Sequence, residues 1–285
     1  MVERVWETAA ILKTTADFLG QKGIDSPRLE AELLLSEVLG LSRVELYVRF
    51  DQVLTPEQVT AYRELVRRRL NHEPSAYILG RKEFYKLTFQ VSPATLIPRP
   101  ETEILVGEAL RLAQTFPQPR LADLGCGCGA IALALAKNLP QCQVIATDLS
   151  PAALEVAKTN AQNLGVADQV EFRQGDLAEP LKGQTLDLIC ANLPYIPTAE
   201  ISTLDPTVAQ FEPRLALDGG PDGLEPYRRL LPQVREILAP GGYLLLEIDP
   251  RALASVQALS AAAGLKCLPP IMDYSRQNRV ALAQA

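Results

Sequence analysis

Hydrophobic residues in the first 73 positions recur every three or four residues, which is the period of amphipathic helices. The first predicted helix rests on this spacing alone, and each of the next three has a start signal: a hydroxyl residue before a proline, or a capping box. The predicted starts are residue 4, Ser26-Pro27, Ser42 (with Glu45) and Thr55 (with Gln58). Gly40 is expected to end the second helix. The pattern therefore predicts a small all-α N-terminal domain over residues 1–75.

The pattern of apolar positions changes after residue 75. Residues 84–91 are β-prone and partly alternating, which predicts a β-hairpin linker within residues 76–98. From residue 99 onward, short apolar strands alternate with helical segments. The predicted strands are 121–124, 143–147, 170–173, 186–191, 243–248, 266–268 and 279–282, and the predicted helices are 130–138, 151–164, 226–238 and 252–263. This alternation predicts a mostly parallel sheet with helices on both faces and a ligand site at the carboxyl ends of its strands.

Composition and charge narrow the class of protein. Of 285 residues, 47% are hydrophobic and 22% are charged, which is typical of a globular protein and excludes a disordered one. No uncharged run approaches the roughly 20 apolar residues of a membrane span, so we expect no membrane association. The net charge of −6 argues against stable nucleic-acid binding. We interpret Arg67, Arg68 and Arg69 as a solvated helix end, with contact to an acidic or RNA partner as the alternative.

The cysteines favour a reducing compartment. They number five, an odd count, and their spacing fits no disulfide framework: Cys126, Cys128, Cys142, Cys190 and Cys267. With His72 as the sole histidine, no obvious set of four zinc ligands exists. We therefore expect a cytoplasmic protein without a metal.

The first candidate site is a glycine loop between a predicted strand and a predicted helix, where glycines permit a sharp turn and close backbone approach to a ligand. Its residues are Gly125, Cys126, Gly127, Cys128 and Gly129. Asp148 follows the next strand and suits two ribose hydroxyls. Asp176 and Leu177 follow the third strand and suit an adenine amino group and ring. These features fit NAD as well as S-adenosylmethionine, and plain turns remain the alternative.

Asn192, Leu193, Pro194 and Tyr195 follow the next apolar strand and distinguish between these cofactors. The side-chain oxygen of Asn192 and the following backbone carbonyl can together accept both hydrogens of a planar NH₂ group, on which an aromatic ring can stack. Such a site binds an amide or an exocyclic amine rather than a hydride donor. The four residues therefore favour S-adenosylmethionine, with a ligand-free turn as the alternative.

With these motifs the chain resembles the HemK/PrmC family of protein-glutamine methyltransferases over its whole length. The matching segments are 96–103, 123–132, 192–197, 212–213, 219–223, 240–242 and 247–248. The resemblance implies a class I S-adenosylmethionine-dependent methyltransferase fold: Rossmann-like α/β, with a seven-stranded sheet. The catalytic domain would span residues 99–285, and the helical domain would aid substrate docking.

The resemblance also implies a role for each candidate residue. The glycine loop would line the methionine part of S-adenosylmethionine, which becomes S-adenosylhomocysteine. Asp148 would hold the ribose, and Asp176 and Leu177 would flank the adenine. The segment from Asn192 to Tyr195 would bind the glutamine of a Gly-Gly-Gln loop in class I peptide-chain release factors.

Two further residues and three departures from the family pattern complete the prediction. Arg99 and Glu101 would order the hinge and the pocket wall, with a structural ion-paired turn as the alternative. The departures are Leu193 in place of a proline, Cys126 and Cys128 in place of small hydroxyl residues, and Asp249 in place of a glycine. Ribosomal-protein glutamine methylation, DNA adenine methylation and a catalytically idle adaptor are the other functions considered.

Overall fold

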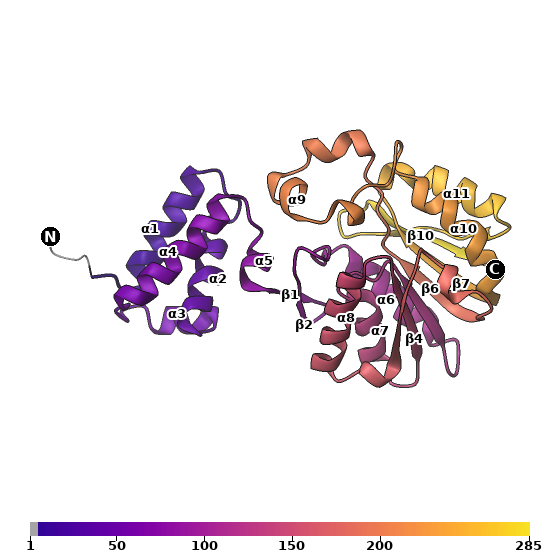
Figure 1. Ribbon diagram of the computed structural model, residues 1–285, viewed down its shortest axis with the longest axis horizontal. Coiled ribbons are helices and arrows are strands. Elements are labelled where there is room, and N and C mark those ends of the chain that lie inside the picture. The colour runs from indigo at the N-terminus through magenta and orange to yellow at the C-terminus, as the bar shows by residue number, and fades with distance from the viewer. Residues whose placement is uncertain (1–4) are drawn as a thin grey trace. The chain divides into compact units, whose positions relative to one another are not determined.

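The computed structural model describes residues 5–285, which form two compact units (Figure 1). The first unit runs to Gly80 and also includes Pro206–Phe211, while the second comprises Arg81–Asp205 and Glu212–Ala285. Within the described residues no helix is both long and apolar enough to cross a membrane.

The first unit is helical, as predicted. Its helices are α1 (Thr8–Gln21), α2 (Pro27–Leu39), α3 (Arg43–Val48), α4 (Pro56–Leu70) and α5 (Ser75–Leu79), together with α9 (Pro206–Phe211). Both predicted capping boxes form, at Ser42 and at Thr55. The capping role predicted for Ser26 is wrong, because its side chain makes no capping hydrogen bond. Helix α1 begins four residues later than predicted, at Thr8, and the predicted start at residue 4 lies outside the described residues.

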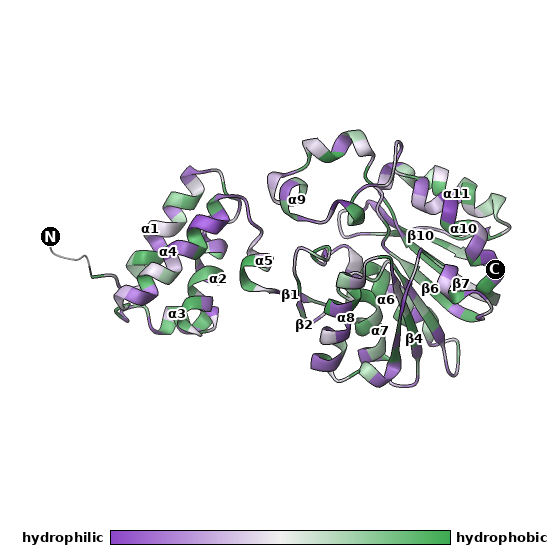
Figure 2. Cartoon of the chain, in the orientation of Figure 1, coloured by the Kyte–Doolittle hydropathy of each residue, from purple (hydrophilic) through white to green (hydrophobic). Residues whose placement is uncertain are grey.

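Helices α1 to α5 of the first unit pack around an apolar core of their own. Leu19, Leu34 and Leu35 are fully buried, and Tyr62 joins them with its hydroxyl donating to the Ala31 carbonyl at 3.0 Å. Figure 2 shows hydrophobic and hydrophilic residues interleaved along these helices. This mixture is what amphipathic helices around a small core require.

The arginine cluster at the end of α4 is used inside this unit. Each guanidinium is paired with a carboxylate: Arg67 with Glu64, Arg68 with Glu73 and Arg69 with Glu30. Arg69 is buried, so the interpretation of a fully solvated face is wrong for that residue. The ion pairs neutralise much of the charge that would attract an acidic partner.

A β-hairpin opens the second unit, where β1 (Arg81–Phe84) pairs antiparallel with β2 (Leu87–Gln90). Tyr85 and Lys86 form the turn with φ of +49° and +61°. Two consecutive positive φ values match the right-handed twist of a two-residue hairpin. The start of the predicted linker, residues 76–79, belongs instead to α5.

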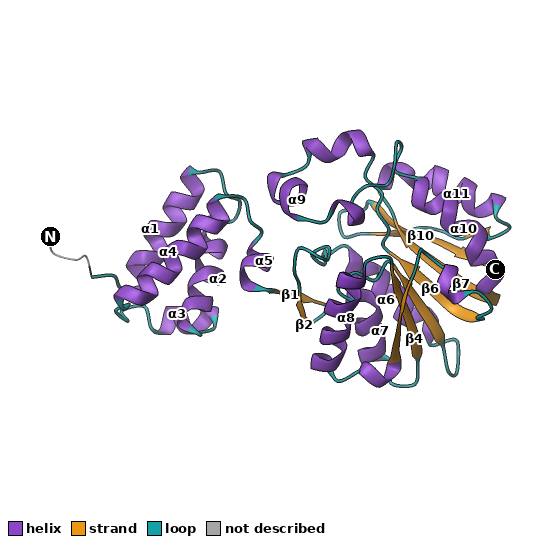
Figure 3. Ribbon diagram, in the orientation of Figure 1, coloured by secondary structure: helices purple, strands orange, loops and turns teal. Residues whose placement is uncertain are grey.

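The second unit is built on a mixed sheet at its centre (Figure 3). Its strands are β3 (Arg120–Leu124), β4 (Gln143–Asp148), β5 (Val170–Gln174), β6 (Leu186–Ala191), β7 (Leu238–Glu247), β8 (Lys266–Cys267), β9 (Ile271–Met272) and β10 (Asn278–Gln284). The order is β5-β4-β3-β6-β7-β10-β8, with β3 to β7 parallel and β10 antiparallel. This arrangement confirms the predicted fold class.

The sheet has eight strands rather than the predicted seven. The additional strand arises because β8 and β9 pair with different stretches of β10, whose opposite edge is occupied by β7. The two short strands therefore share one position, and the sheet is seven positions wide.

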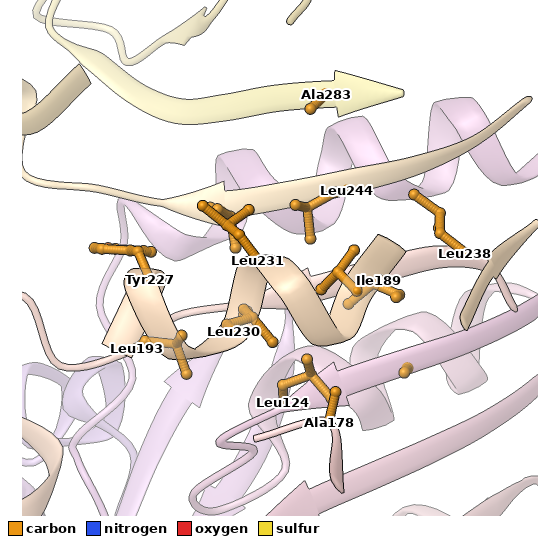
Figure 4. Packing of buried hydrophobic residues seen from close by; sticks show 14 of the residues in the cluster. Leu124, Ala178, Ile189, Leu193, Tyr227, Leu230, Leu231, Leu238, Leu244 and Ala283 are labelled. Carbon is orange, nitrogen blue, oxygen red and sulfur yellow. The ribbon is translucent and has the colours of Figure 1, made fainter. Parts of the chain in front are cut away.

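Helices cover both faces of the sheet (Figure 1). Helices α6 (Thr102–Ala113), α7 (Ala130–Asn138) and α8 (Pro151–Leu164) pack side by side on one face, and α10 (Glu225–Ile237) and α11 (Leu253–Ala262) pack together on the other. Short 3-10 helices lie at Ala167–Gln169, Glu179–Leu181, Thr198–Thr203, Arg214–Ala216 and Pro250–Ala252. Figure 4 shows Tyr227, Leu230 and Leu231 of α10 in the core with Ile189 and Leu244 of the sheet. This packing fixes the strand ends that carry the candidate site.

Candidate functional site

A cavity of about 340 Å³ lies at the carboxyl ends of β3, β4, β5 and β6. Strand order reverses between β3 and β6, which is where ligands bind in open α/β sheets. The predicted site residues that line the cavity are Gly125, Cys126, Gly127, Cys128, Asp148, Asp176, Leu177, Asn192, Leu193 and Pro194. Gly129 and Tyr195 are not among its lining residues. Residues between Gly125 and Pro194 that are far apart in the sequence are thus gathered around a space in the size range of small-molecule sites.

The glycine loop presents backbone to the cavity at Gly127. Its φ is +55°, which favours glycine, and a Cβ atom at this position would meet nothing within 4 Å. The Gly127 N–H donates to Asp148 Oδ2 at 2.8 Å. The loop is therefore held by the neighbouring strand end and leaves open space where a ligand can lie against the backbone.

Asp148 both supports the loop and offers acceptors. Its second carboxylate oxygen, Oδ1, accepts from the Ser150 N–H at 2.8 Å, so each oxygen keeps a further lone pair for a ligand. Burial raises the pKa of Asp148, although the backbone hydrogen bonds oppose the shift. Two oxygens with free acceptor capacity at the end of β4 are compatible with the predicted ribose hydroxyls.

Asp123 lies behind the loop, at the end of β3, and is fully buried. Its Oδ2 accepts from the Ala132 N–H at 2.9 Å, whereas Oδ1 has no hydrogen-bond partner among the described residues. Burial, with a smaller contribution from the Asp148 charge, raises the pKa of Asp123 to about 7. An incompletely partnered buried acid of this kind is common at ligand sites.

The strand end after β5 contributes Asp176 and Leu177. The Asp176 carboxylate is paired with Arg229 of α10, which also lines the cavity. Leu177 has φ of +52°, and its carbonyl accepts from the Thr147 hydroxyl at 2.9 Å. Sequence reasoning missed Arg229, because no local pattern indicates that α10 meets this strand end.

Asn192 lines the cavity directly after β6. Its Nδ2 donates to the Thr102 hydroxyl oxygen at 3.2 Å, and none of residues 5–285 donates to its Oδ1. Leu193 next to it is buried in the core beneath α10, as Figure 4 shows. Thr102 was missed as well, although it lies in the segment 96–103 that carries part of the family resemblance.

The backbone after Asn192 is held by a second glycine-rich segment. The Gly219 N–H donates to the Ile196 carbonyl at 2.8 Å. Gly223 has φ of +75°, and a Cβ atom there would overlap the Tyr195 carbonyl oxygen. Residues 219–223, noted from sequence only for their resemblance, thus support the backbone of the candidate acceptor site.

The Tyr195 side chain packs against the same core cluster as Tyr227 rather than on the cavity. Burial raises the pKa of the Tyr195 phenol, which therefore stays protonated at neutral pH. Stacking of this ring on a bound NH₂ group stays a prediction.

Arg99 and Glu212 join two of the segments on which the resemblance depends. The Arg99 guanidinium pairs with the Glu212 carboxylate, whose other oxygen accepts from the Ile97 N–H at 3.1 Å. Because Glu212 is buried and Arg99 lines the cavity, this ion pair fixes part of the cavity wall. Glu101 precedes α6 and makes no side-chain capping hydrogen bond.

Asp249, the least explained departure, has a local structural role. It caps the 3-10 turn Pro250–Ala252 by accepting from the Arg251 N–H at 2.8 Å. Its carboxylate also pairs with the Arg251 guanidinium, which reaches Glu200 at 2.9 Å. A glycine could not make these contacts.

A buried asparagine connects the hairpin to the glycine loop. Asn160 of α8 donates to the carbonyls of Gln90 and Cys128, at 3.0 and 2.9 Å. Its Oδ1 accepts from the Gln90 N–H at 2.7 Å. One side chain therefore holds β2 and the glycine loop together.

Two family profiles match the chain, the PrmC N-terminal domain over residues 10–80 and a methyltransferase domain over residues 118–267. Among solved structures, the hMettl16 catalytic domain in complex with a MAT2A 3'UTR hairpin superposes with a TM-score of 0.60 at 16% identity, covering 75% of this chain and 83% of that one. A ribosomal protein L11 methylase from Lactobacillus delbrueckii subsp. bulgaricus superposes with a TM-score of 0.50 at 20% identity, covering 68% of this chain and 83% of that one. At these identities the structures support the fold alone.

Curated relatives are much more similar in sequence. The release factor glutamine methyltransferase of Geobacter sulfurreducens is 48% identical over 86% of this chain and 84% of its own. The enzyme of Rhodopirellula baltica is 44% identical over 96% of this chain and 95% of its own. The enzyme of Moorella thermoacetica is 45% identical over 93% of this chain and 94% of its own.

Proposed function

The chain belongs to the release factor glutamine methyltransferase family, and on that premise we propose that it methylates a glutamine side chain in a class I peptide-chain release factor. The methyl donor is S-adenosylmethionine, and the acceptor is the amide nitrogen of the glutamine in a Gly-Gly-Gln loop. One observation carries the proposal: Asn192, Leu193 and Pro194 border the same cavity as the glycine loop. A donor on the loop and an amide on Asn192 would therefore meet in one space.

The residues around the cavity fit S-adenosylmethionine. Gly127 offers backbone without a side chain, Asp148 offers carboxylate acceptors for ribose hydroxyls, and Leu177 offers an apolar surface for the adenine. S-adenosylmethionine supplies a methyl group that its sulfonium charge has already activated. The remaining task of the protein is to bring the acceptor nitrogen into line.

Orientation is the main contribution we assign to Asn192 and Leu193. An amide nitrogen is a weak nucleophile, because its lone pair is delocalised into the carbonyl. The Asn192 Oδ1 and the Leu193 carbonyl would accept its two hydrogens and hold the nitrogen in line behind the methyl carbon. Such positioning can supply about 7–11 kcal/mol, and the two acceptors also favour the positive charge that develops on nitrogen.

No strong base is assigned to the reaction. His72, the sole histidine, does not line the cavity, and the Tyr195 phenol stays protonated because burial raises its pKa. The proton is released to water after methyl transfer, when the nitrogen carries a positive charge and is strongly acidic.

We assign substrate docking to residues 1–75, linkage to residues 76–98 and catalysis to residues 99–285. The release factor is the protein partner, and neither nucleic acid nor a metal takes part. The five cysteines are free thiols, which supports a reducing, cytoplasmic location.

Methyl transfer from tritiated S-adenosylmethionine tests the function directly. We expect label in a purified class I release factor, and no label in the same factor with its Gly-Gly-Gln glutamine changed to alanine. Ribosomal protein and DNA serve as parallel acceptors. Label confined to either of them would overturn the proposal in favour of ribosomal-protein or adenine methylation.

A further inference from the structure

Two buried polar side chains behind Asn192 have no role in the function proposed so far. Thr102 begins α6 and is 4% exposed, while Glu247 ends β7 and is 1% exposed. Burying a hydroxyl and a carboxylate is costly unless both are hydrogen-bonded. Their partners therefore indicate what these two side chains do.

The two residues form a chain of hydrogen bonds that ends on Asn192. Asn192 Nδ2 donates to the Thr102 oxygen at 3.2 Å, and the Thr102 hydroxyl is hydrogen-bonded to the Glu247 carboxylate. An ionised carboxylate can only accept, so the Thr102 hydroxyl must donate to it. The Thr102 oxygen then remains an acceptor, and the group facing it must be the NH₂ end of Asn192.

This direction has a consequence for the opposite end of the Asn192 side chain. The oxygen and nitrogen ends of an asparagine amide differ only by a rotation of 180°, and its neighbours decide which one faces a ligand. We infer that Thr102 and Glu247 are positioning residues that hold Asn192 with its Oδ1 toward the substrate. The inference rests on the proposed function, because it gives the site an acceptor for the glutamine NH₂ group.

The same chain provides specificity. A reversed Asn192 would present NH₂ to the cavity and would suit the carboxylate of a glutamate side chain. With Oδ1 presented instead, a carboxylate would face an oxygen with no hydrogen to share. The chain from Glu247 therefore favours glutamine over glutamate at the acceptor position.

Glu247 is placed so that its ionisation can control this direction. Its Oε2 has no hydrogen-bond partner among the described residues, which leaves one oxygen open to a proton. The groups that act on its charge are Arg279 of β10, Arg99 and Glu101 ahead of α6, and the phenols of Tyr195 and Tyr227. Burial outweighs the arginines and raises the pKa of Glu247 to about 7. Rotation of the protonated carboxyl group by 180° would turn this O–H toward Thr102 as a donor, and the fixed direction would then be lost.

Thr102→Val, Thr102→Ser and Glu247→Gln in the full-length protein test the inference. Thr102→Val keeps the shape and removes the hydroxyl, so single-turnover transfer into a release factor should fall about 10- to 100-fold, as is typical when a supporting hydrogen bond is lost. Thr102→Ser should restore the rate to within a few-fold. Thr115→Val is the matched control, because it removes a hydroxyl that donates to the Leu112 carbonyl just past the other end of α6.

The pH profile distinguishes positioning from general structural support. The wild-type rate should decline as the pH falls through about 7, the pKa of Glu247. The Glu247→Gln variant should transfer the methyl group more slowly than the wild type. Its rate should not show this decline, because the glutamine side chain cannot ionise. Affinity for S-adenosylmethionine, measured by calorimetry, should change less than threefold in every variant.

A second readout does not depend on the substrate. In protein labelled with [¹⁵N]asparagine, the Asn192 NH₂ resonance of the wild type should shift through pH 7, and Thr102→Val and Glu247→Gln should each abolish the shift. Suppose that the wild type labels the release factor. If Thr102→Val then reacts as fast as the wild type, or if Thr102→Ser is as slow as Thr102→Val, the positioning inference is wrong and the proposed function still stands. If the wild type did not label the release factor, the proposed function would fail, and the resonance shift would still decide the positioning role.

Discussion

Asn192 and Leu193 are neighbours in the chain, yet at the scale of single residues they contribute differently. Asn192→Ala removes the side-chain oxygen proposed to accept from the substrate. We expect single-turnover methyl transfer to fall about 100- to 1000-fold, the usual effect of losing one well-placed polar group at a reacting centre. Calorimetry should show nearly unchanged S-adenosylmethionine binding. A rate within a few-fold of wild type would contradict the proposed capture of the amide.

Leu193→Pro is the companion variant. Only the backbone carbonyl of Leu193 is assigned to the substrate, and proline retains that carbonyl. The leucine side chain, however, is 3% exposed within the core. We expect a loss of about 1–3 kcal/mol in the free energy of unfolding, measured in urea, with a rate per folded molecule close to wild type. A larger loss of rate than in Asn192→Ala would contradict this division of roles.

Asp123 should make stability depend on pH. Burial raises its pKa from 3.8 to about 7 in the folded protein, so between these values the folded state holds a proton that the unfolded state has released. Stability from this group is therefore complete below about pH 4 and declines as the pH rises to about 7. We therefore compare the free energy of unfolding of ligand-free Asp123→Asn with that of the wild type, both measured in urea. The difference should shift in favour of the variant by about 1 kcal/mol or more between pH 4 and pH 8. A difference independent of pH would show that Asp123 ionises normally.

Single residues also show how far sequence reasoning extends. The positions of Gly127, Asp148 and Asn192 could be predicted, because each lies at or within three residues of the end of a recognisable strand and parallel strands end at the same edge. Arg229 and Glu247 could not be assigned to the site, since their relevance depends on how α10 and β7 pack. Local patterns locate the residues at strand ends, and tertiary packing supplies their partners.

Among structural elements, the glycine-rich turn 219–223 is the most sensitive support of the site. Gly223→Ala would bring a methyl group onto the Tyr195 carbonyl oxygen. Gly183→Ala is the matched control, because Gly183 also has a positive φ, +83°, but a Cβ there would meet nothing within 4 Å. The control should cost only the left-handed strain of about 1–2 kcal/mol. Compared with this control, Gly223→Ala should unfold at a lower temperature, and its rate of methyl transfer should be at least tenfold lower. Equal effects of the two substitutions would argue against a supporting role for the turn.

Element boundaries were predicted best where the local signals agree. Helices α7 and α8 and strand β6 match the prediction to the residue, because each is bounded by glycine, proline or a sharp change in hydropathy. Helix α6 was not predicted, since it begins without a side-chain cap after two prolines. The division into β8 and β9 could not be predicted either, because it follows from pairing with β10.

At the scale of the whole molecule, we proposed that the helical N-terminal residues dock the substrate and that the rest of the chain is catalytic. Deleting residues 1–73 removes most of a unit that has its own apolar core. We expect the remainder to bind S-adenosylmethionine with similar affinity, because the cavity is lined entirely by residues after position 93. Methylation of a release factor should fall at least tenfold, mainly through a higher KM. Equal activity of the truncated and intact proteins would contradict a docking role.

The bridge made by Asn160 gives the hairpin a measurable connection to the cofactor. The Gln90 N–H can exchange with solvent only when its 2.7 Å bond to Asn160 opens, and Asn160 is also bonded to the glycine loop at Cys128. A ligand that orders the loop makes this opening rarer. Deuterium uptake at Gln90 should therefore slow several-fold when S-adenosylmethionine is added, and Asn160→Ala should remove the difference. The backbone proton of a residue outside the cavity would thus act as an internal reporter of whether the enzyme is loaded.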